Sequence, residues 1–219
     1  AGIFSSNSLN MSVAGDWTNT GTFSYGVDGA VYLDGTDQTI YGSTDFYDLV
    51  KEIPSATGHT LTFEALSEQT VANSLTLKGF SESDGERLLL RSSTSTNEQA
   101  YLTLASGGEQ DIRYVDVENN NAENGMTLLG RDSADAGSND NWQIGTITIT
   151  WTGAQDTDWN NRFNWNMESV PVAGETVVIC SSGATGCAAD VPNQPTLTSA
   201  VSLGSLELKP GAVLTLEQN

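Results

Sequence analysis

Apolar residues in this chain alternate with polar ones over short runs, and glycines separate many of these runs. In residues 60–63 and 74–78 every second residue is apolar. A period of two places the apolar side chains on one face of a β-strand. Helical spacing of apolar residues is almost absent, and its nearest case, residues 46–51, also fits a strand. The pattern predicts an all-β chain of many short strands and tight turns.

Short sequence similarities recur along the chain. An acidic residue followed by glutamine precedes a strand-like run at Gln38, Gln69 and Gln99, and the two intervals between these glutamines are almost equal. Residues 74–79 also resemble residues 205–211. Recurrence at ~20–50 residues is typical of stacked units that share one core. A β-sandwich also has short alternating strands, but it does not explain the recurrence, so we expect a parallel β-solenoid.

A tryptophan-rich segment, residues 151–165, separates two series of strand-like runs. It contains three of the five tryptophans, Trp151, Trp159 and Trp165, and a new series follows over residues 170–216. We therefore predict a β-helix module over residues 1–150 and a second, smaller β-rich module over residues 151–219. Bulky tryptophans can cap a solenoid and cover its open strand edges. The alternative is that the three rings contact a glycan.

Three short motifs resemble a known family of repeat proteins. Residues 29–35 (GAVYLDG), 38–42 (QTIYG) and 46–49 (FYDL) resemble the coil signature of bacterial surface right-handed parallel β-helix proteins. Leu33 stands where that family more often has an aromatic residue. Residues 112–117 and 132–142 look like the end of such a helix, and residues 151–171 look like the start of a further module. The resemblance implies a right-handed parallel β-helix with a structural or adhesive extracellular role, and it carries no catalytic residues with it.

The composition excludes some partners. The chain has 28 acidic and 8 basic residues and a net charge of −20, whereas binding to nucleic-acid phosphates requires clustered lysine and arginine. No run approaches the ~18 apolar residues of a membrane span. The first residues lack the basic start and long apolar core of a signal peptide, which fits a processed secreted protein or a piece of a longer chain.

The two cysteines are close in sequence. Cys180 and Cys187 bracket a short loop that contains glycine, so they can reach the small Cα separation of a disulfide. A metal site would need more ligands, and the only histidine, His59, is far away in sequence. We predict a Cys180–Cys187 disulfide and an oxidising, extracellular setting.

One loop combines several oxygen ligands. Carboxylate and amide oxygens in a flexible loop are what calcium prefers, and the loop of residues 131–141 contains four such side chains: Asp132, Asp135, Asn139 and Asp140. Their spacing differs from that of an EF-hand loop, and aspartate and asparagine also form turns without a metal. Calcium is therefore the candidate cofactor, with Asp156 and Asp158 as a second, weaker site.

No catalytic motif stands out. The best grouping of charged residues is Asp111, Arg113, Asp116 and Arg131, and solvated surface charge explains it equally well. His59 lies in a turn, and the chain has no Gly-x-Ser-x-Gly motif for a nucleophilic serine. We predict no catalytic residues.

The expected function is therefore structural or adhesive. We predict a non-enzymatic extracellular repeat protein, either a surface stalk or a filament subunit. Both ends of the chain carry strand-like sequence, which predicts a neighbouring copy stacked end to end, or flanking sequence in the same place; a cell-surface or glycan ligand is the other expected partner. The alternative is a carbohydrate-binding or polysaccharide-degrading β-helix protein.

Overall fold

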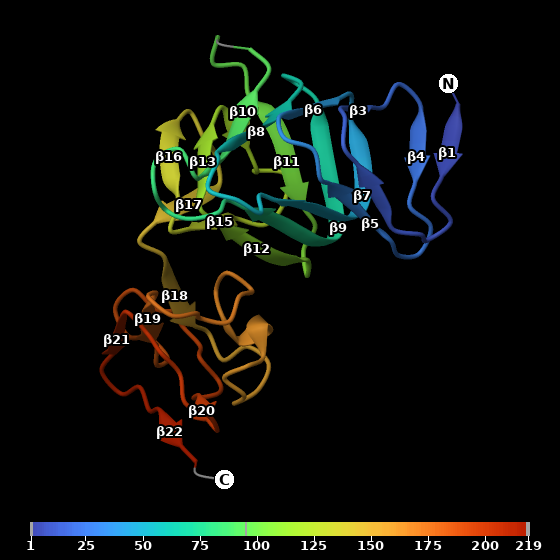
Figure 1. Ribbon diagram of the computed structural model, residues 1–219. Helices are drawn as coiled ribbons and strands as arrows, with labels where there is room; N and C mark the ends of the chain where they lie inside the picture. Colours follow the sequence, from blue (N-terminus) through green and yellow to red (C-terminus); the bar gives the residue numbers. More distant parts are fainter. Residues whose placement is uncertain (1, 95, 218–219) are drawn as a thin grey trace. The chain divides into compact units, whose positions relative to one another are not determined.

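A computed structural model describes residues 2–94 and 96–217 of the chain (Figure 1). The fold is all-β, and the one helical element in the described residues is a 3₁₀ turn, η1 (Arg162–Asn164). The chain divides into two compact units, Ala1–Gly145 and Thr146–Asn219. The sequence placed this boundary after residue 150. The structure places it earlier because β18 (Thr148–Trp151) pairs with β19 (Thr176–Ile179) in the second unit.

The first unit contains two large parallel sheets. A six-stranded sheet has the order β16-β13-β10-β8-β6-β3. In chain order its strands are β3 (Trp17–Thr18), β6 (Gln38–Tyr41), β8 (His59–Phe63), β10 (Leu88–Ser92), β13 (Val115–Glu118) and β16 (Ala134–Gly137).

The second sheet of this unit has nine strands. Its main path is β17-β15-β12-β9-β7-β5-β2, and β11 and β14 branch from β9. The strands are β2 (Met11–Val13), β5 (Ala30–Leu33), β7 (Thr44–Glu52), β9 (Glu68–Lys78), β11 (Ala100–Leu104), β12 (Glu109–Arg113), β14 (Asn120–Asn121), β15 (Leu128–Arg131) and β17 (Trp142–Gly145). A parallel pair, β1 (Ile3–Ser5) and β4 (Thr22–Ser24), completes the unit.

The chain passes repeatedly between the two large sheets, and the strands within each sheet pair in parallel. The length of chain between two paired residues varies. Leu128 pairs with Trp142, whereas Leu75 pairs with Gln110, which is more than twice as far along the chain. Loops of different length therefore join strands that pair in parallel, with register shifts in the β13–β16 and β7–β9 pairs. The sequence has no constant period for this reason.

Alternation along the strands places one core inside the first unit. In β8, Leu61 and Phe63 are fully buried, while Thr60 and Thr62 are only partly buried. The same pattern fills the core with the following fully buried side chains: Ile40, Phe46, Leu49, Val71, Leu75, Leu77, Leu88, Leu90, Leu102, Leu104, Ile112, Val115, Val117 and Leu128. Burial of this apolar surface is the main contribution to the stability of the unit.

The three glutamines that suggested a repeat are not equivalent. Gln38 lies in the six-stranded sheet and pairs with Leu61, whereas Gln69 lies in the nine-stranded sheet and pairs with Leu102. Gln99 precedes β11, outside a strand. The acid-Gln spacing is therefore not the structural repeat. Each glutamine instead bonds a different neighbouring segment; the Gln69 amide, for example, donates to the Gly42 carbonyl at 2.9 Å.

The second unit is smaller. A three-stranded parallel sheet contains β18, β19 and β21 (Ser205–Leu208), and a parallel pair contains β20 (Thr196–Leu197) and β22 (Thr215–Leu216). Its core combines aliphatic residues of β18 and β19 with three tryptophans: Ile149, Val177, Ile179, Trp151, Trp159 and Trp165 are at most 2% exposed.

Candidate functional site

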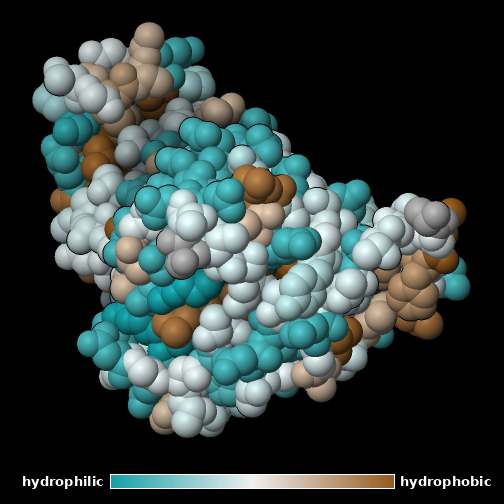
Figure 2. Space-filling view, turned by 90° about the horizontal axis from the view of Figure 1, so that it is seen from above, coloured by the Kyte–Doolittle hydropathy of each residue, from teal (hydrophilic) through white to brown (hydrophobic). Residues whose placement is uncertain are grey.

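Several outer strands have a neighbour on one side only. In the first unit β2 and β3 each end a sheet, and β1 pairs only with β4 in the described residues. An outer strand presents backbone N–H and C=O groups that another strand can pair with. The pair β1–β4 also exposes apolar side chains, because Ile3 is 79% and Phe4 56% exposed. Hydrophobic residues gather at this end of the first unit in Figure 2.

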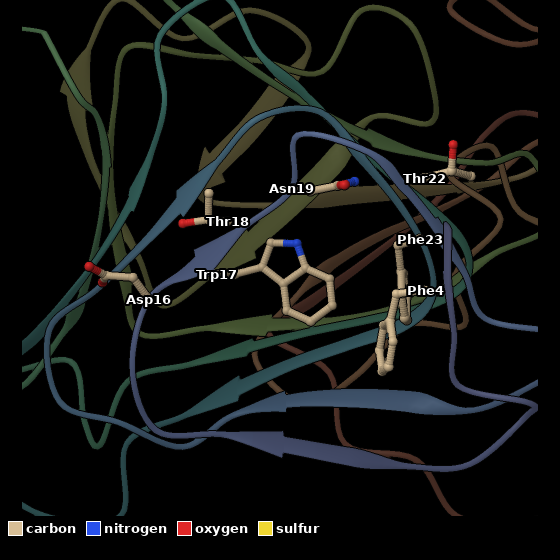
Figure 3. Close-up of a pocket in the computed structure, with 7 residues that line it drawn as sticks. All are labelled: Phe4, Asp16, Trp17, Thr18, Asn19, Thr22 and Phe23. Carbon is tan, nitrogen blue, oxygen red and sulfur yellow. The ribbon is translucent and has the colours of Figure 1, made fainter. Parts of the chain in front are cut away.

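A groove lies between this strand pair and β3 (Figure 3). It has a volume of about 240 Å³ and is lined by Phe4, Asp16, Trp17, Thr18, Asn19, Thr22 and Phe23. The Trp17 and Phe23 rings meet edge to face with centroids 5.0 Å apart, and Phe4 stacks on Phe23 at 5.9 Å. The groove floor is therefore a packed aromatic layer. We call the β1–β4 pair with this groove the N-terminal edge.

The second unit has a comparable outer edge. In the described residues β21 pairs only with β19, and β22 pairs only with β20. All four residues of β21 are exposed, with Leu206 at 42% and Leu208 at 49%, and Leu216 in β22 is 71% exposed. We call these two strands the C-terminal edge. Both named edges thus combine a strand that lacks a partner on one side with exposed apolar side chains.

The predicted calcium loop is held by hydrogen bonds. One Asp135 carboxylate oxygen accepts from the Asn139 amide at 2.7 Å. The Asp140 carboxylate accepts from the Gln99 amide at 2.7 Å, and the backbone carbonyl of Asp132 accepts from the Arg87 guanidinium at 2.7 Å. The side chains of Asp135, Asn139 and Asp140 therefore bond one another or neighbouring segments, whereas Asp132 does so through its backbone. Among residues 2–94 and 96–217 no three His, Cys, Asp or Glu side chains gather as a metal site.

Calcium is accordingly expected to leave the stability of the chain almost unchanged. One carboxylate oxygen of Asp135 and one of Asp140 already accept protein N–H groups, so an ion bound to these two atoms would have to replace those hydrogen bonds. The melting temperature in millimolar calcium should equal the melting temperature in millimolar magnesium, because the two ions screen the negative charge equally well. A rise in the melting temperature specific to calcium, and lost in Asp135→Asn, would contradict this expectation.

The tryptophan-rich segment forms a buried core. Trp165 meets Trp151 edge to face at 4.9 Å and Trp159 at 4.7 Å, and all three are at most 2% exposed. The indole N–H of Trp165 donates to the Trp159 carbonyl at 2.9 Å. A sugar stacks only on an exposed ring face. The three tryptophans are therefore core residues of the second unit, and the prediction of glycan contact at these positions is wrong.

A polar loop surrounds this core. The buried side chain of Asn164 accepts from the N–H groups of Gln155 and Asp156 and donates to Asp156 at 2.7 Å. Hydrogen bonds from Asn161 and then Asn164 lower the pKa of the Asp156 carboxyl. The Asp158 carboxylate accepts from the Asn160 N–H at 2.9 Å. The second candidate calcium site is thus also a network of hydrogen bonds within one loop.

The predicted disulfide is present. Cys180 and Cys187 are joined, with a Cα–Cα distance of 5.7 Å, inside the usual range for a disulfide. Cys180 directly follows β19 and is 1% exposed. The bond therefore fixes the following loop to the core of the second unit. No helix in the described residues is long and apolar enough to cross a membrane.

The predicted group of charged residues is split between two sheets. Arg113 donates to Asp111 at 2.8 Å in β12, and Arg131 pairs with Arg113 in register. Asp116 lies in β13 of the other sheet and forms an ion pair with Arg91 at 2.9 Å. His59 is in β8, where its ring contacts the Thr57 hydroxyl at 3.3 Å. The structure does not bring the four charged residues into one site.

The sequence predicts strand-like ends of the chain, but it does not identify the aromatic groove of the N-terminal edge. Its aromatic residues, Phe4, Trp17 and Phe23, fall close to the start of the chain, where they are indistinguishable from ordinary core positions. Their spacing in sequence carries no period because they come from three different strands. The density of aromatics in so short a stretch was the available signal.

Comparisons with protein-family models, with curated proteins and with solved structures give no significant match to this chain.

Proposed function

We propose that this chain is a non-enzymatic, extracellular structural protein whose copies stack end to end, as a surface stalk or filament subunit does. The first unit would then be a right-handed parallel β-helix, consistent with its resemblance to bacterial surface proteins. The disulfide supports an oxidising compartment. The observation that carries the proposal is the pair of open, apolar strand edges, one in each unit.

The geometry of parallel strands supports the proposal of stacking. An outer strand of a parallel sheet accepts a further strand that runs in the same direction. The N-terminal edge of one copy and the C-terminal edge of the next are different surfaces, so their contact is heterologous. Heterologous contacts that do not close into a ring produce open filaments. The exposed apolar side chains of both edges would be buried in the same step.

The high negative charge sets the conditions for stacking. A net charge of −20 makes copies repel one another. At about 0.01 M salt the screening length is about 30 Å, and at about 1 M it is about 3 Å. Stacking should therefore require high ionic strength.

A cysteine cross-link tests which edges meet. Ser5 lies in β1 and Ser205 lies in β21, and both are exposed. A chain carrying Ser5→Cys and Ser205→Cys should form a ladder of cross-linked oligomers at high salt under mild oxidation, resolved on non-reducing gels. Each single-cysteine chain is the control and should stop at the dimer. A double variant that also stops at the dimer would contradict head-to-tail stacking.

Charge on the N-terminal edge should block stacking. Ile3→Lys places a cation on a strand where a neighbouring chain would pair, a device that natural edge strands use against association. Since Ile3 is 79% exposed, folding should be unaffected. The concentration for half-maximal assembly should rise at least about tenfold, equivalent to about 1.4 kcal/mol, measured by light scattering. Val27→Lys, in an 82% exposed turn position, is the matched control and should leave assembly unchanged.

A further inference from the structure

The outer face of the nine-stranded sheet carries an ordered strip of side chains in register. Tyr32 of β5 pairs with Val50 of β7, Val50 pairs with Thr76 of β9, and Thr76 pairs with Asp111 of β12. The four positions form one row across four adjacent strands. At about 4.8 Å per strand spacing, the row is about 14 Å long. The row begins with the ring of Tyr32, which is 38% exposed. It ends with the carboxylate of Asp111.

A charged row lies two residues further along the same strands. Glu52 pairs with Lys78, and Lys78 pairs with Arg113. The Lys78 ammonium contacts Glu52 at 3.1 Å and Asp111 at 2.7 Å, and Arg113 donates to Asp111 at 2.8 Å. The row itself has one acid and two bases, and Asp111 of the neighbouring row contacts both bases. These four side chains together present hydrogen-bond donors and acceptors with no net charge.

This network is fixed in its charged form. The hydrogen bond to Asp111 is the main cause that raises the pKa of Lys78. Partial burial acts to raise the pKa of Asp111, but hydrogen bonds from Lys78 and Arg113 outweigh it and lower that pKa. Side chains held in place by one another lose little freedom when a ligand binds.

A groove of about 410 Å³ lies over the aromatic end of the strip. It is lined by Tyr32, Leu33, Asp34, Val50, Glu52 and Thr76. An apolar surface with a few fixed polar groups beside it is the usual composition of a small-ligand site. This groove joins the Tyr32 row to the charged row through Glu52.

We propose that this strip, from Tyr32 to Arg113, binds a neutral polysaccharide. A sugar ring has an apolar face and an edge of hydroxyl groups. The face would stack on Tyr32 and Val50, and the hydroxyls would bond Glu52, Lys78 and Asp111. An acidic polysaccharide fits less well, because the cations of the strip are already paired with carboxylates and the chain as a whole is strongly negative. This inference is independent of end-to-end stacking.

Affinity electrophoresis of the full chain tests the inference. The gels contain neutral polymers (hydroxyethyl cellulose, galactomannan, arabinoxylan or amylopectin) or acidic ones (polygalacturonate or alginate). We expect retardation by at least one neutral polymer. Tyr32→Ala should weaken that binding at least about tenfold, since exposed aromatic anchors dominate such contacts. Tyr41→Ala is the matched control, because Tyr41 is 40% exposed and lies in β6 of the other sheet.

A second variant separates binding from folding. Lys78→Met keeps the aliphatic stem and removes the hydrogen-bond donors, so it should weaken binding several-fold while Tyr32 is intact. Near-ultraviolet circular dichroism confirms that each variant is folded. The inference is overturned if no neutral polymer retards the chain, if Tyr32→Ala and Tyr41→Ala weaken binding equally, or if only acidic polymers bind. If Ile3→Lys no longer stacks but is still retarded by the neutral polymer, the stacking proposal and the polysaccharide site are shown to be separate, and the inference stands.

Discussion

Replacing Trp165 with alanine is expected to unfold the second unit. Trp165 is 2% exposed and contacts both Trp151 and Trp159 edge to face. Removing a buried tryptophan typically costs about 3–5 kcal/mol, and the substitution also removes the hydrogen bond to the Trp159 carbonyl. A unit as short as Thr146–Asn219 has limited stability to lose. Urea unfolding followed by tryptophan fluorescence and limited proteolysis should show loss of protection over residues 146–217.

The neighbouring aromatic residue gives the control. Phe163 lies in η1, two residues before Trp165, and is 44% exposed. Phe163→Ala should therefore change the free energy of unfolding by less than about 0.5–1 kcal/mol. Equal losses for the two variants would contradict a tryptophan core in this unit. The first unit should unfold at the same urea concentration in both variants.

Raising the pH from 8 to 10.5 is expected to stabilise the first unit through Lys51. This lysine is fully buried, and burial lowers its pKa from 10.5 to about 8. Between these values the unfolded chain binds one more proton than the folded chain, so the free energy of unfolding rises with pH. The shift is equivalent to about 3 kcal/mol at about 1.36 kcal/mol per pKa unit. This contribution is present above pH 10.5 and is lost as the pH falls through 8.

The variant Lys51→Met removes this pH dependence. In the wild type the Lys51 ammonium donates to the carbonyls of Gly35 and Thr36 and to the Gln38 side chain at 2.7 Å. Methionine removes the donor to these three acceptors, although the Gln38 oxygen still accepts from the Gly35 N–H at 3.0 Å. The variant should therefore be less stable across the whole range. The difference in free energy between wild type and variant, measured by urea unfolding near pH 8 and at pH 10.5, should increase with pH.

The all-β class was predictable because strand alternation is a local property. Leu61 and Phe63 alternate with threonines whatever sheet the strand joins. The disulfide was predictable for the same reason, because Cys180 and Cys187 are near each other in sequence and need no long-range information.

The position of Lys51 was not predictable from the pattern. It occupies an inward position of β7 and pairs with Leu77, where an apolar residue is expected. Its partners, Gly35, Thr36 and Gln38, belong to an earlier turn and the start of β6. Only the folded chain brings those three oxygens to one point.

The burial of the tryptophans was not predictable, because sequence gives aromatic clusters no direction. Trp151, Trp159 and Trp165 lie among aspartate and asparagine residues, and the sequence left both a cap over strand edges and a glycan contact open. In the structure those polar residues bond one another: Asn164 binds Asp156 and the backbone. Polar groups satisfied in this way can surround a buried core.

Sedimentation velocity of the wild-type chain tests end-to-end stacking most directly. At about 1 M salt, where repulsion between the copies is screened, the account predicts a series of species whose sizes grow with protein concentration. Lowering the salt to about 0.01 M should return the chain to a single slow species. One species of monomer mass at every concentration and at both salt levels would contradict the account.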